Sequence, residues 1–378
     1  MTGQKKVFAI SELVLKRYPE QERQSTLQAW DSADEYLLDA FLNLGEIPGR
    51  LLLINDGFGA LTCALNAFHP VNVSDSYISQ QAAKLNLRRN HLAEDVGEFI
   101  DCLTNFPIDP AVVLIKIPKT LALLEFQLYQ LSLVVTPKTI IIAGAKTQDI
   151  HTSTLHLFEK WLGPTKTSLA KKKSRLIFCQ PTGEKRDELS PLLSWPLEST
   201  NYQIANYPSV FSRSSLDIGA RFFMAHLPTG LEGKIADLGC GNGVIGLTAL
   251  EKNPQASLLF TDESHMAVES ARYNIAFNRQ ADLGRCQFTV DNSLSQQPDG
   301  SLQAVLCNPP FHQNNAITDH IARQMFGDAK RCLIKGGELR IIGNRHLGYH
   351  HYLRKLFGNC ETLASNNKFV ILKSIKAI

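Results

Sequence analysis

The sequence of 378 residues has no uninterrupted apolar run of the roughly 18 to 20 residues that a helix needs to cross a bilayer. Its first residues contain two lysines, but neither the apolar stretch nor the small-residue cleavage site of a secretory signal. A hydrophobic content of 44% and a charged content of 20% are ordinary for a globular protein. These features predict a cytoplasmic chain with no part in a membrane.

Cysteine pairs at the spacing of metal or redox motifs are also missing. The eight cysteines include no Cys-x-x-Cys pair and form no Cys/His cluster at zinc spacing. Unpaired thiols of this kind are mostly buried and reduced in cytoplasmic proteins. The sequence therefore predicts neither a disulfide framework nor a metal site.

A large excess of charge of one sign is absent from the chain as a whole, because the net charge is only +3. The charges are unevenly spread, however: residues 160–186 contain eight basic side chains and a single acidic one, Glu184. A second basic stretch runs from Arg323 to Lys355. Such clusters can neutralise phosphates, or they can simply be solvated surface. The candidate phosphate contacts in the two stretches are Lys166, Lys171, Lys172, Lys173 and Arg345.

A glycine-rich turn joins an expected strand at 233–239 to an expected helix at 244–250, and it contains Gly239, Gly241 and Gly243. Glycine permits a positive φ and a close approach of the backbone to a ligand. Turns of this kind bind nucleotides in doubly wound sheets. Because the pattern begins with Asp237 and no P-loop lysine follows, it is neither the dinucleotide fingerprint nor a phosphate loop. We expect Asp237 to face the charged amino-acid end of an S-adenosyl cofactor.

Two acidic positions follow the next two expected strands. Asp262 comes after the strand at 256–261 and is placed to accept hydrogen bonds from the ribose hydroxyls, although an Asp here can also be a helix N-cap. Asp291 and Asn292 follow the strand at 286–290. A carboxylate there suits the adenine amino group, with the neighbouring backbone amide on the ring; the alternative is an ordinary turn.

Asn308, Pro309, Pro310 and Phe311 follow a fourth, fully apolar strand at 304–307. An exocyclic amine on a base is a poor nucleophile, because its lone pair is delocalised into the ring. The Asn308 side-chain oxygen and the Pro309 carbonyl can hold the amine hydrogens, so that the lone pair turns towards a sulfonium methyl. The two prolines fix the backbone, and Phe311 offers a face for stacking. Positioning and electrostatics then supply most of the rate enhancement, and the order and spacing of the two motifs indicate a methyltransferase.

Residues 207–219 precede the first strand of this domain and contain Phe211 and Asp217. Such a segment commonly lies over the methionine end of the cofactor. Phe211 and Asp217 are therefore candidate cofactor contacts, or else an entrance residue and a helix cap.

The N-terminal half repeats the same order of elements, since residues 51–65 match residues 235–250 as strand, glycine turn and small-residue helix. Counting along the two copies places Asp75 opposite Asp262, Asn90 opposite Asn274 and Lys116 opposite Asn308. The fold class expected is α/β, with two tandem Rossmann-like S-adenosylmethionine methyltransferase domains. The polar segment near residue 190 contains proline and glycine and separates domain 1–190 from domain 191–378.

The first copy lacks the chemistry of the second. Lys116 and Lys119 stand where Asn308 and Phe311 stand in the second copy, and the glycine turn has fewer glycines and no leading Asp. We expect the first domain to be degenerate and catalytically silent. It either binds RNA, with Lys116 and Lys119 as possible phosphate contacts, or only stabilises the second domain.

The chain resembles the bacterial ribosomal RNA guanine-N2 methyltransferases of the RlmG/RsmC type, in which only the second of two methyltransferase domains is active. The resemblance covers nearly the whole chain and rests on residues 27–38, 114–125, 143–154, 210–219 and 308–312. It implies transfer of one methyl group from S-adenosylmethionine to the exocyclic N2 amine of a guanine in 23S rRNA. It further implies naked or partly assembled RNA as the substrate. No obligate protein partner is evident from the sequence.

Asn-Pro-Pro-aromatic corners also serve enzymes that methylate adenine, cytosine or the amide of protein glutamine. The residues by themselves therefore leave open a 16S rRNA substrate, a protein-glutamine N5 methyltransferase of release-factor type, and a non-enzymatic RNA-binding assembly factor. The release-factor enzymes carry a small helical N-terminal domain, which does not fit a repeated α/β pattern. The intact Asn308 corner counts against an assembly factor without turnover.

Overall fold

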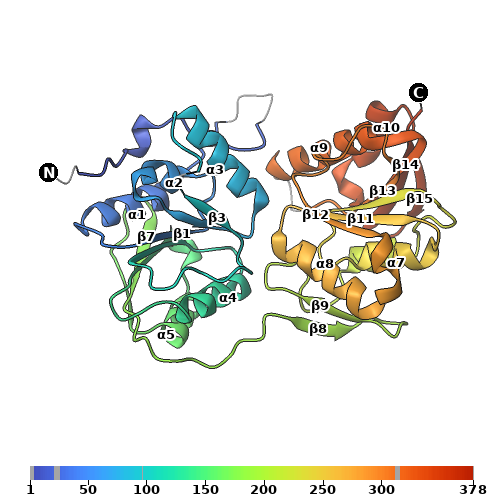
Figure 1. Ribbon diagram of the computed structural model, residues 1–378. Helices are drawn as coiled ribbons and strands as arrows, with labels where there is room; N and C mark the ends of the chain where they lie inside the picture. Colours follow the sequence, from blue (N-terminus) through green and yellow to red (C-terminus); the bar gives the residue numbers. More distant parts are fainter. Residues whose placement is uncertain (1–3, 21–25, 96, 311–315, 378) are drawn as a thin grey trace. The chain divides into compact units, whose positions relative to one another are not determined.

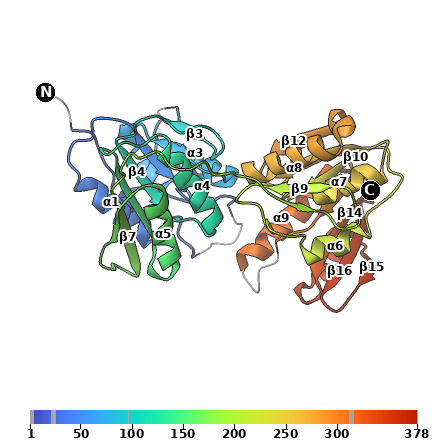
Figure 2. The ribbon, with the colours of Figure 1, turned by 90° about the horizontal axis from the view of Figure 1, so that it is seen from below.

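The computed structural model describes residues 4–20, 26–95, 97–310 and 316–377, and the chain divides into two compact units, Met1–Ser190 and Pro191–Ile378. Figures 1 and 2 show that each unit is built on a central sheet with helices on both of its faces. No helix within the described ranges is both long and apolar enough to span a bilayer.

The sheet of the first unit has seven strands, of which the first five in spatial order are parallel and β7 is antiparallel to both of its neighbours. In spatial order the strands are β3 (Glu98–Ile100), β2 (Val71–Val73), β1 (Leu51–Ile54), β4 (Val112–Lys116), β5 (Ile140–Lys146), β7 (Ser174–Cys179) and β6 (Thr165–Thr167). The helices are η1 (Ile10–Glu12), α1 (Ser32–Leu42), α2 (Ala60–Ala64), η2 (Asn66–Phe68), α3 (Tyr77–Arg89), α4 (Leu121–Ser132), η3 (Thr147–Asp149) and α5 (Thr152–Trp161).

The second unit has the same sheet, with an antiparallel strand pair, β8 (Leu193–Pro196) and β9 (Gln203–Asn206), preceding it in the chain. In spatial order its strands are β12 (Cys286–Val290), β11 (Ser257–Asp262), β10 (Lys234–Leu238), β13 (Leu302–Cys307), β14 (Leu333–Asn344), β16 (Phe369–Ile375) and β15 (Glu361–Ser365). The helices are α6 (Ile218–Met224), α7 (Val244–Lys252), α8 (His265–Asn278), η4 (Gln280–Arg285), α9 (Ala316–Cys332), η5 (Arg345–Leu347) and α10 (Tyr349–Phe357).

Both sheets are doubly wound, which confirms the expected fold class. In each, the strand order runs outwards in two directions from a central parallel pair, β1 with β4 and β10 with β13. Ligands of such sheets bind where the order reverses, at the carboxyl ends of that central pair. The glycine turn follows β10 and Asn308 follows β13, so both motifs lie at this switch point.

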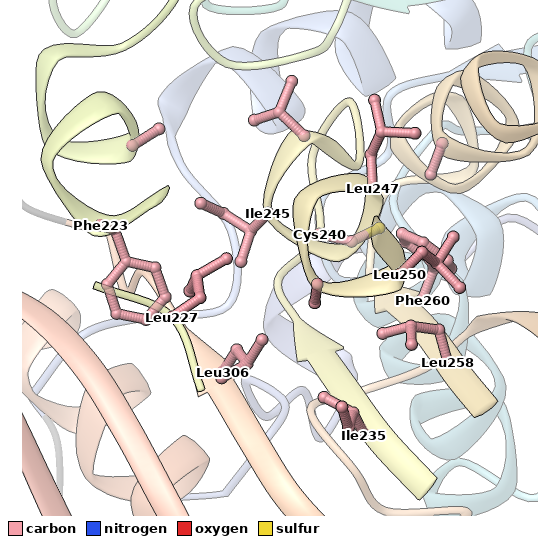
Figure 3. Close-up of a cluster of buried hydrophobic side chains, with 14 of the residues drawn as sticks. Phe223, Leu227, Ile235, Cys240, Ile245, Leu247, Leu250, Leu258, Phe260 and Leu306 are labelled. Carbon is pink, nitrogen blue, oxygen red and sulfur yellow. The ribbon is translucent and has the colours of Figure 1, made fainter. Parts of the chain in front are cut away.

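The side chains of the central strands contribute alternately to two hydrophobic cores, because successive side chains of a strand point to opposite faces of the sheet. Ile235 of β10 packs in a cluster with residues of α6, α7 and α8, whereas Ala236 packs with residues of α9 and α10. Figure 3 shows Ile235, Leu306 of β13 and Ile245 of α7 converging in the first cluster. Truncating a side chain such as Leu306 to alanine would cost about 2–5 kcal/mol, and it would loosen the strand that carries Asn308.

The helix after the glycine turn lies unusually close to the sheet. A Cβ atom added at Gly246 of α7 would lie 2.2 Å from the ring of Phe260 on β11. Only glycine permits this approach, which fixes the position of α7 and of the turn before it. The small-residue character of residues 244–250 therefore has a packing origin.

The two units can be aligned residue by residue at their turns. Gly59 and Gly243 are the N-cap residues of α2 and α7, with φ values of 88° and 83°. Asn55 and Gly239 then correspond, with φ values of 65° and 69°. The strand pairing agrees, because Ile54 pairs with Ile115 as Leu238 pairs with Cys307. Lys116 therefore does occupy the position of Asn308.

Two of the expected equivalences are wrong. Ser76 and Ser264 are the N-caps of α3 and α8, so Ser74 and not Asp75 corresponds to Asp262. The side chains that correspond along these helices are Asn86 with Asn274 and Asn90 with Asn278. Counting residues failed here because the segment between the glycine turn and the second strand differs in length between the copies.

Candidate cofactor and substrate site

The glycine turn is held against the neighbouring strand by its backbone. The N–H groups of Gly239 and Cys240 both donate to the carbonyl oxygen of Thr261, at 2.9 and 3.0 Å. Gly239, Gly241 and Gly243 have φ values of 69°, 52° and 83°, in the left-handed region that glycine adopts without strain. A Cβ atom at Gly241 would meet nothing within 4 Å. The turn therefore presents bare backbone to open space.

Asp237 is buried beneath this turn, with only 2% of its surface exposed. Its carboxylate accepts a 2.9 Å hydrogen bond from the N–H of Gly246 in α7. Burial raises the pKa of Asp237 to about 8, although the hydrogen bond from Gly246 opposes the rise. The side chain expected to face the cofactor thus ties β10 to α7.

Asp262, at the end of β11, holds the same turn from the other side. One carboxylate oxygen accepts from the N–H of Gly241 and the other from the N–H of Ser264, both at 3.0 Å. Burial raises the pKa of Asp262 above its ordinary value. The backbone N–H of Glu263 is a third donor to this carboxylate. A carboxylate has about four lone-pair sites, so one remains for a ribose hydroxyl. The N-cap of α8 is Ser264 and not Asp262, which removes the alternative explanation of this acid.

The segment after β12 departs from the expectation for Asp291. Its carboxylate is 1% exposed and accepts hydrogen bonds from the Ser295 hydroxyl and the Gln296 N–H. The turn interpretation therefore describes the Asp291 side chain better than an adenine contact does. Asn292 is 5% exposed and accepts from Gln324 of α9 at 3.0 Å. The Ser293 hydroxyl beside them is buried with no hydrogen-bond partner among the described residues.

Asn308 follows β13 directly and is half-buried, with Pro309 buried behind it. Its side-chain nitrogen donates a 3.5 Å hydrogen bond to Oδ2 of Asp217. No residue within the described ranges donates a hydrogen bond to the Asn308 side-chain oxygen. Pro310 continues the corner, and Phe311 lies outside the described residues.

Asp217 caps a helix, which was one of its two expected roles, and it also makes a contact that was not expected. It is the N-cap of α6, since Oδ2 accepts from the N–H of Ala220 at 2.9 Å, and it also contacts Asn308. Phe211 and Ile218 on either side of it are 68% and 57% exposed. Exposed apolar side chains at these positions suit an entrance to the site.

An asparagine network that the motifs did not indicate holds the glycine turn in place. Asn274 of α8 is fully buried and donates to the carbonyls of Ala205 and Asn242, at 2.9 and 2.8 Å. The Asn242 side chain donates to Oδ1 of Asn206 at 3.0 Å. In the first unit, Asn86 makes the equivalent bonds to Lys16 and Phe58. The signal available in the sequence was an asparagine at the same helical position in both copies.

The corresponding position in the first unit is occupied by charged side chains that form ion pairs with one another. The ammonium group of Lys116 lies 2.9 Å from both Asp31 and Asp34, and the side chains of Lys116 and Asp34 are only 16% and 6% exposed. Burial raises the pKa of Asp34 to about 6 despite the nearby Lys116. The side-chain nitrogen of Asn55 donates hydrogen bonds to the Lys116 carbonyl oxygen and to the Gln127 side-chain oxygen, at 2.9 Å each.

Lys116 is therefore withdrawn from the candidate RNA contacts, because its charge is already compensated inside the domain. The other candidates are exposed: Lys119, Lys166, Lys171, Lys172, Lys173 and Arg345. Lys171 and Lys172 pair with Asp39 and Glu35, in contacts where all four side chains are at least 40% exposed. Such pairs contribute little, so these lysines can exchange their partners for phosphates.

The second unit fits an S-adenosyl cofactor and the first does not. The second has three left-handed glycines, open space over Gly241, an acid at the end of β11 and a Ser293 hydroxyl with no partner among the described residues. The first has Asn55 in place of Gly239, Ser74 in place of Asp262, and Lys116 bound to two carboxylates.

A doubly wound sheet with this turn and an Asn-Pro-Pro corner at its switch point defines an S-adenosylmethionine-dependent methyltransferase. Residues 201–373 match the family model described as the methyltransferase small domain, and residues 5–183 match the one described as the RLMG N-terminal domain. The chain belongs to the ribosomal RNA large subunit methyltransferase G family. It is 59% identical to the Yersinia enterocolitica member over 96% of this chain and 92% of that protein. It is 58% identical to the Yersinia pseudotuberculosis member over the same shares.

The fold of both units recurs in a solved structure. It is similar to the T. thermophilus 16S rRNA N2 G1207 methyltransferase (RsmC), solved in complex with AdoMet and guanosine, with a TM-score of 0.72. The sequences are 18% identical, and the match covers 96% of this chain and 95% of that one. This likeness shows a shared architecture of two tandem domains.

Proposed function

We propose that this protein transfers a methyl group from S-adenosylmethionine to the exocyclic N2 amine of one guanine in 23S ribosomal RNA. The observation that carries the proposal is the position of Asn308, at the carboxyl end of β13 and at the same switch point as the glycine turn. The names of the curated relatives, which are large-subunit rRNA methyltransferases, support the 23S substrate. A cytoplasmic location follows from such a substrate.

The backbone at Gly239, Gly241 and Gly243 would hold the cofactor, and the Asp262 carboxylate would accept a hydrogen bond from its ribose. When bound, S-adenosylmethionine supplies an electrophilic methyl group. In this proposal adenine lies beyond the end of β12, where the Ser293 hydroxyl has no hydrogen-bond partner among the described residues. Phe211 borders the entrance. In this arrangement Asp237 supports the turn from below and does not bind the cofactor directly.

Asn308 and Pro309 act on the target base. The Asn308 side-chain oxygen and the Pro309 carbonyl accept the two hydrogens of the amine, which turns the nitrogen lone pair towards the methyl group. The amine loses one proton to solvent as the new C–N bond forms and the bond from sulfur to the methyl carbon breaks. Phe311 stacks on the base in this proposal. Because the work is mainly alignment, the site needs no strong general base.

The exposed basic residues supply the RNA contacts. Lys119, Lys166, Lys173 and Arg345 form no ion pair with another described residue, so each can neutralise a phosphate without breaking an ion pair. The target guanine must leave its stack, at a cost of about a few kcal/mol that these contacts offset. An open RNA presents such a base more readily than an assembled particle, which favours naked or partly assembled 23S rRNA.

The test is incubation with labelled S-adenosylmethionine and, separately, deproteinised 23S rRNA, deproteinised 16S rRNA and intact subunits. The expected result is label in 23S rRNA that digests to N2-methylguanosine. Label in 16S rRNA alone would move the substrate to the small subunit and keep the chemistry. Cofactor binding without label in any RNA would overturn the RNA substrate and point to a protein amide.

A further inference from the structure

We propose that Asp217 is a positioning residue that fixes the orientation of the Asn308 amide, and that it is not a contact of the cofactor. The inference rests on the proposed function of Asn308. It concerns a side chain that caps α6 and contacts the residue directly after β13 at the same time.

The contact selects one of two amide orientations. A carboxylate accepts hydrogen bonds and donates none, so the group facing Asp217 must be the amide nitrogen of Asn308. An amide turned by 180° would set its oxygen against the carboxylate oxygen at 3.5 Å. Asp217 thereby directs the Asn308 oxygen away from itself, to the side where a substrate amine needs an acceptor.

The first unit makes the same contact with different residues, which is a second and independent observation. Asp31 is the N-cap of α1 as Asp217 is of α6. The two helices pack on corresponding strands, α1 on β5 and β7, and α6 on β14 and β16. Asp31 lies 2.9 Å from Lys116, the residue at the Asn308 position. The fold thus brings an N-cap carboxylate to the end of the fourth strand in both copies.

The residue at the end of that strand decides what the carboxylate does. In the first unit it neutralises an ammonium group, which has three donors and no acceptor. In the second unit it holds an amide, which keeps an oxygen for another donor. Two donors share Oδ2 of Asp217, the Ala220 N–H and the Asn308 amide, so capping and positioning can be separated by the length of the side chain.

Asp217→Ser is the decisive variant, because serine is also a preferred N-cap but is too short to reach Asn308. We expect kcat to fall about tenfold to a hundredfold, as for a misplaced catalytic group, with little change in the cofactor Kd. Asp217→Asn keeps an acceptor at the same distance, and its kcat should recover towards that of the wild type. Ser76→Ala, which removes the N-cap of α3 in the first unit, is the control for loss of a cap and should leave kcat unchanged.

The double variant Asp217→Ser/Asn308→Ala should be no slower than Asn308→Ala, since two residues acting as one unit are not additive. Losses that multiply would overturn the inference, as would a kcat of Asp217→Ser equal to that of the wild type. A cofactor Kd weakened as much as kcat falls would return Asp217 to the cofactor site. If Asn308→Ala itself keeps full turnover, the proposed role of Asn308 fails, which is a distinct result from failure of Asp217 alone.

Discussion

Lys116 and Asn308 occupy the same position in two copies of one fold. The comparison shows that a small change of residues, on nearly the same backbone, separates a candidate binding site from a position occupied by a buried ion-pair cluster. Both follow the fourth strand, and both contact the N-cap carboxylate of the helix that precedes the first strand. At Asn308 the nitrogen of a neutral amide contacts Asp217, and no described residue donates a hydrogen bond to the amide oxygen. At Lys116 an ammonium group and two carboxylates satisfy one another. The first unit has the same architecture, but the polar residues at the equivalent position form ion pairs with one another inside the domain.

The largest expected effect comes from removing the acceptor. Asn308→Ala should lower kcat by about a hundredfold or more, in the range of removing one preorganised group that contacts the reacting atoms, while the cofactor Kd stays near that of the wild type. Single-turnover methylation and calorimetric cofactor titration measure the two quantities. Equal losses in both would contradict the assigned role.

The matching change in the first unit should affect stability and not turnover. Lys116→Met leaves the buried Asp34 without its partner, and breaking a buried pair on one side costs about 3–5 kcal/mol. Urea unfolding followed by the fluorescence of Trp30 and Trp161, both in the first unit, reports the loss.

The control for this change is Lys171→Met, which breaks an ion pair whose two side chains are 54% and 52% exposed and should cost less than about 1 kcal/mol. If Lys116→Met and Lys171→Met destabilise the first unit equally, the buried cluster is not structural.

Asp262→Ala should have the opposite effect to Asn308→Ala, because it should weaken cofactor binding more than it lowers kcat. Loss of a hydrogen-bonding charged group costs about 1.5–3 kcal/mol, so the cofactor Kd should weaken about tenfold to a hundredfold, with a smaller change in kcat at saturating cofactor. The first unit has Ser74 at this position, and Ser74→Ala should leave cofactor binding unchanged. A cofactor Kd of Asp262→Ala like that of the wild type would remove the ribose contact.

The pH dependence of unfolding should depend on a buried carboxyl in each unit, Asp56 in the first and Asp237 in the second, because burial raises the pKa of both. The folded-state pKa of Asp237 is raised to about 8, against about 3.9 in an unfolded chain. The folded state therefore holds a proton that unfolding releases, and the free energy of unfolding of the second unit falls as pH rises from about 4 to 8. Asp237 contributes at most about 1.4 kcal/mol per pH unit to this slope. Asp237→Asn should remove that contribution, whereas Asp262 and Asp291, whose pKa values are also raised, keep theirs. If the free energy of unfolding changes with pH in the same way in the wild type and in Asp237→Asn, this prediction is wrong.

The smallest effect is expected from the exposed lysines of the first unit. Lys166→Ala and Lys173→Ala should each weaken RNA binding several-fold and reduce the slope of log K against log salt by about 0.7–0.9. Lys138→Ala, at an exposed position outside the basic stretch, serves as the control. An unchanged salt slope in all three variants would leave the first unit as a stabilising partner only.

Much of the second unit could be predicted because its signals are local. A glycine turn between a strand and a helix, an acid at the end of β11 and a rigid proline corner each depend on a few adjacent residues, and the structure has all three elements in the expected places. The sequence left two interpretations of Asp291 open, because a carboxylate that follows a strand can bind a ligand or its own turn. Only the backbone path brings Ser295 and Gln296 to this carboxylate.

The alignment of the two copies was predicted only in part. The turn and the fourth strand were matched correctly, because glycine and apolar runs mark them. Asp75 and Asn90 were each matched to the wrong residue, because nothing in the sequence marks where the longer copy gained its extra residues. The caps of α3 and α8 settle the register.

The sequence by itself determined the duplicated α/β fold, the methyltransferase motifs and the loss of chemistry in the first copy. These follow from hydrophobic periodicity, from glycine and proline stereochemistry and from the identity of single residues. Only the tertiary structure decided that Lys116 is compensated by Asp31 and Asp34, that Asn274 holds the glycine turn, and that Asp217 reaches Asn308. Each of these joins residues at least 32 positions apart, and the partner of a buried polar group is fixed by which elements pack together and not by its neighbours in the chain.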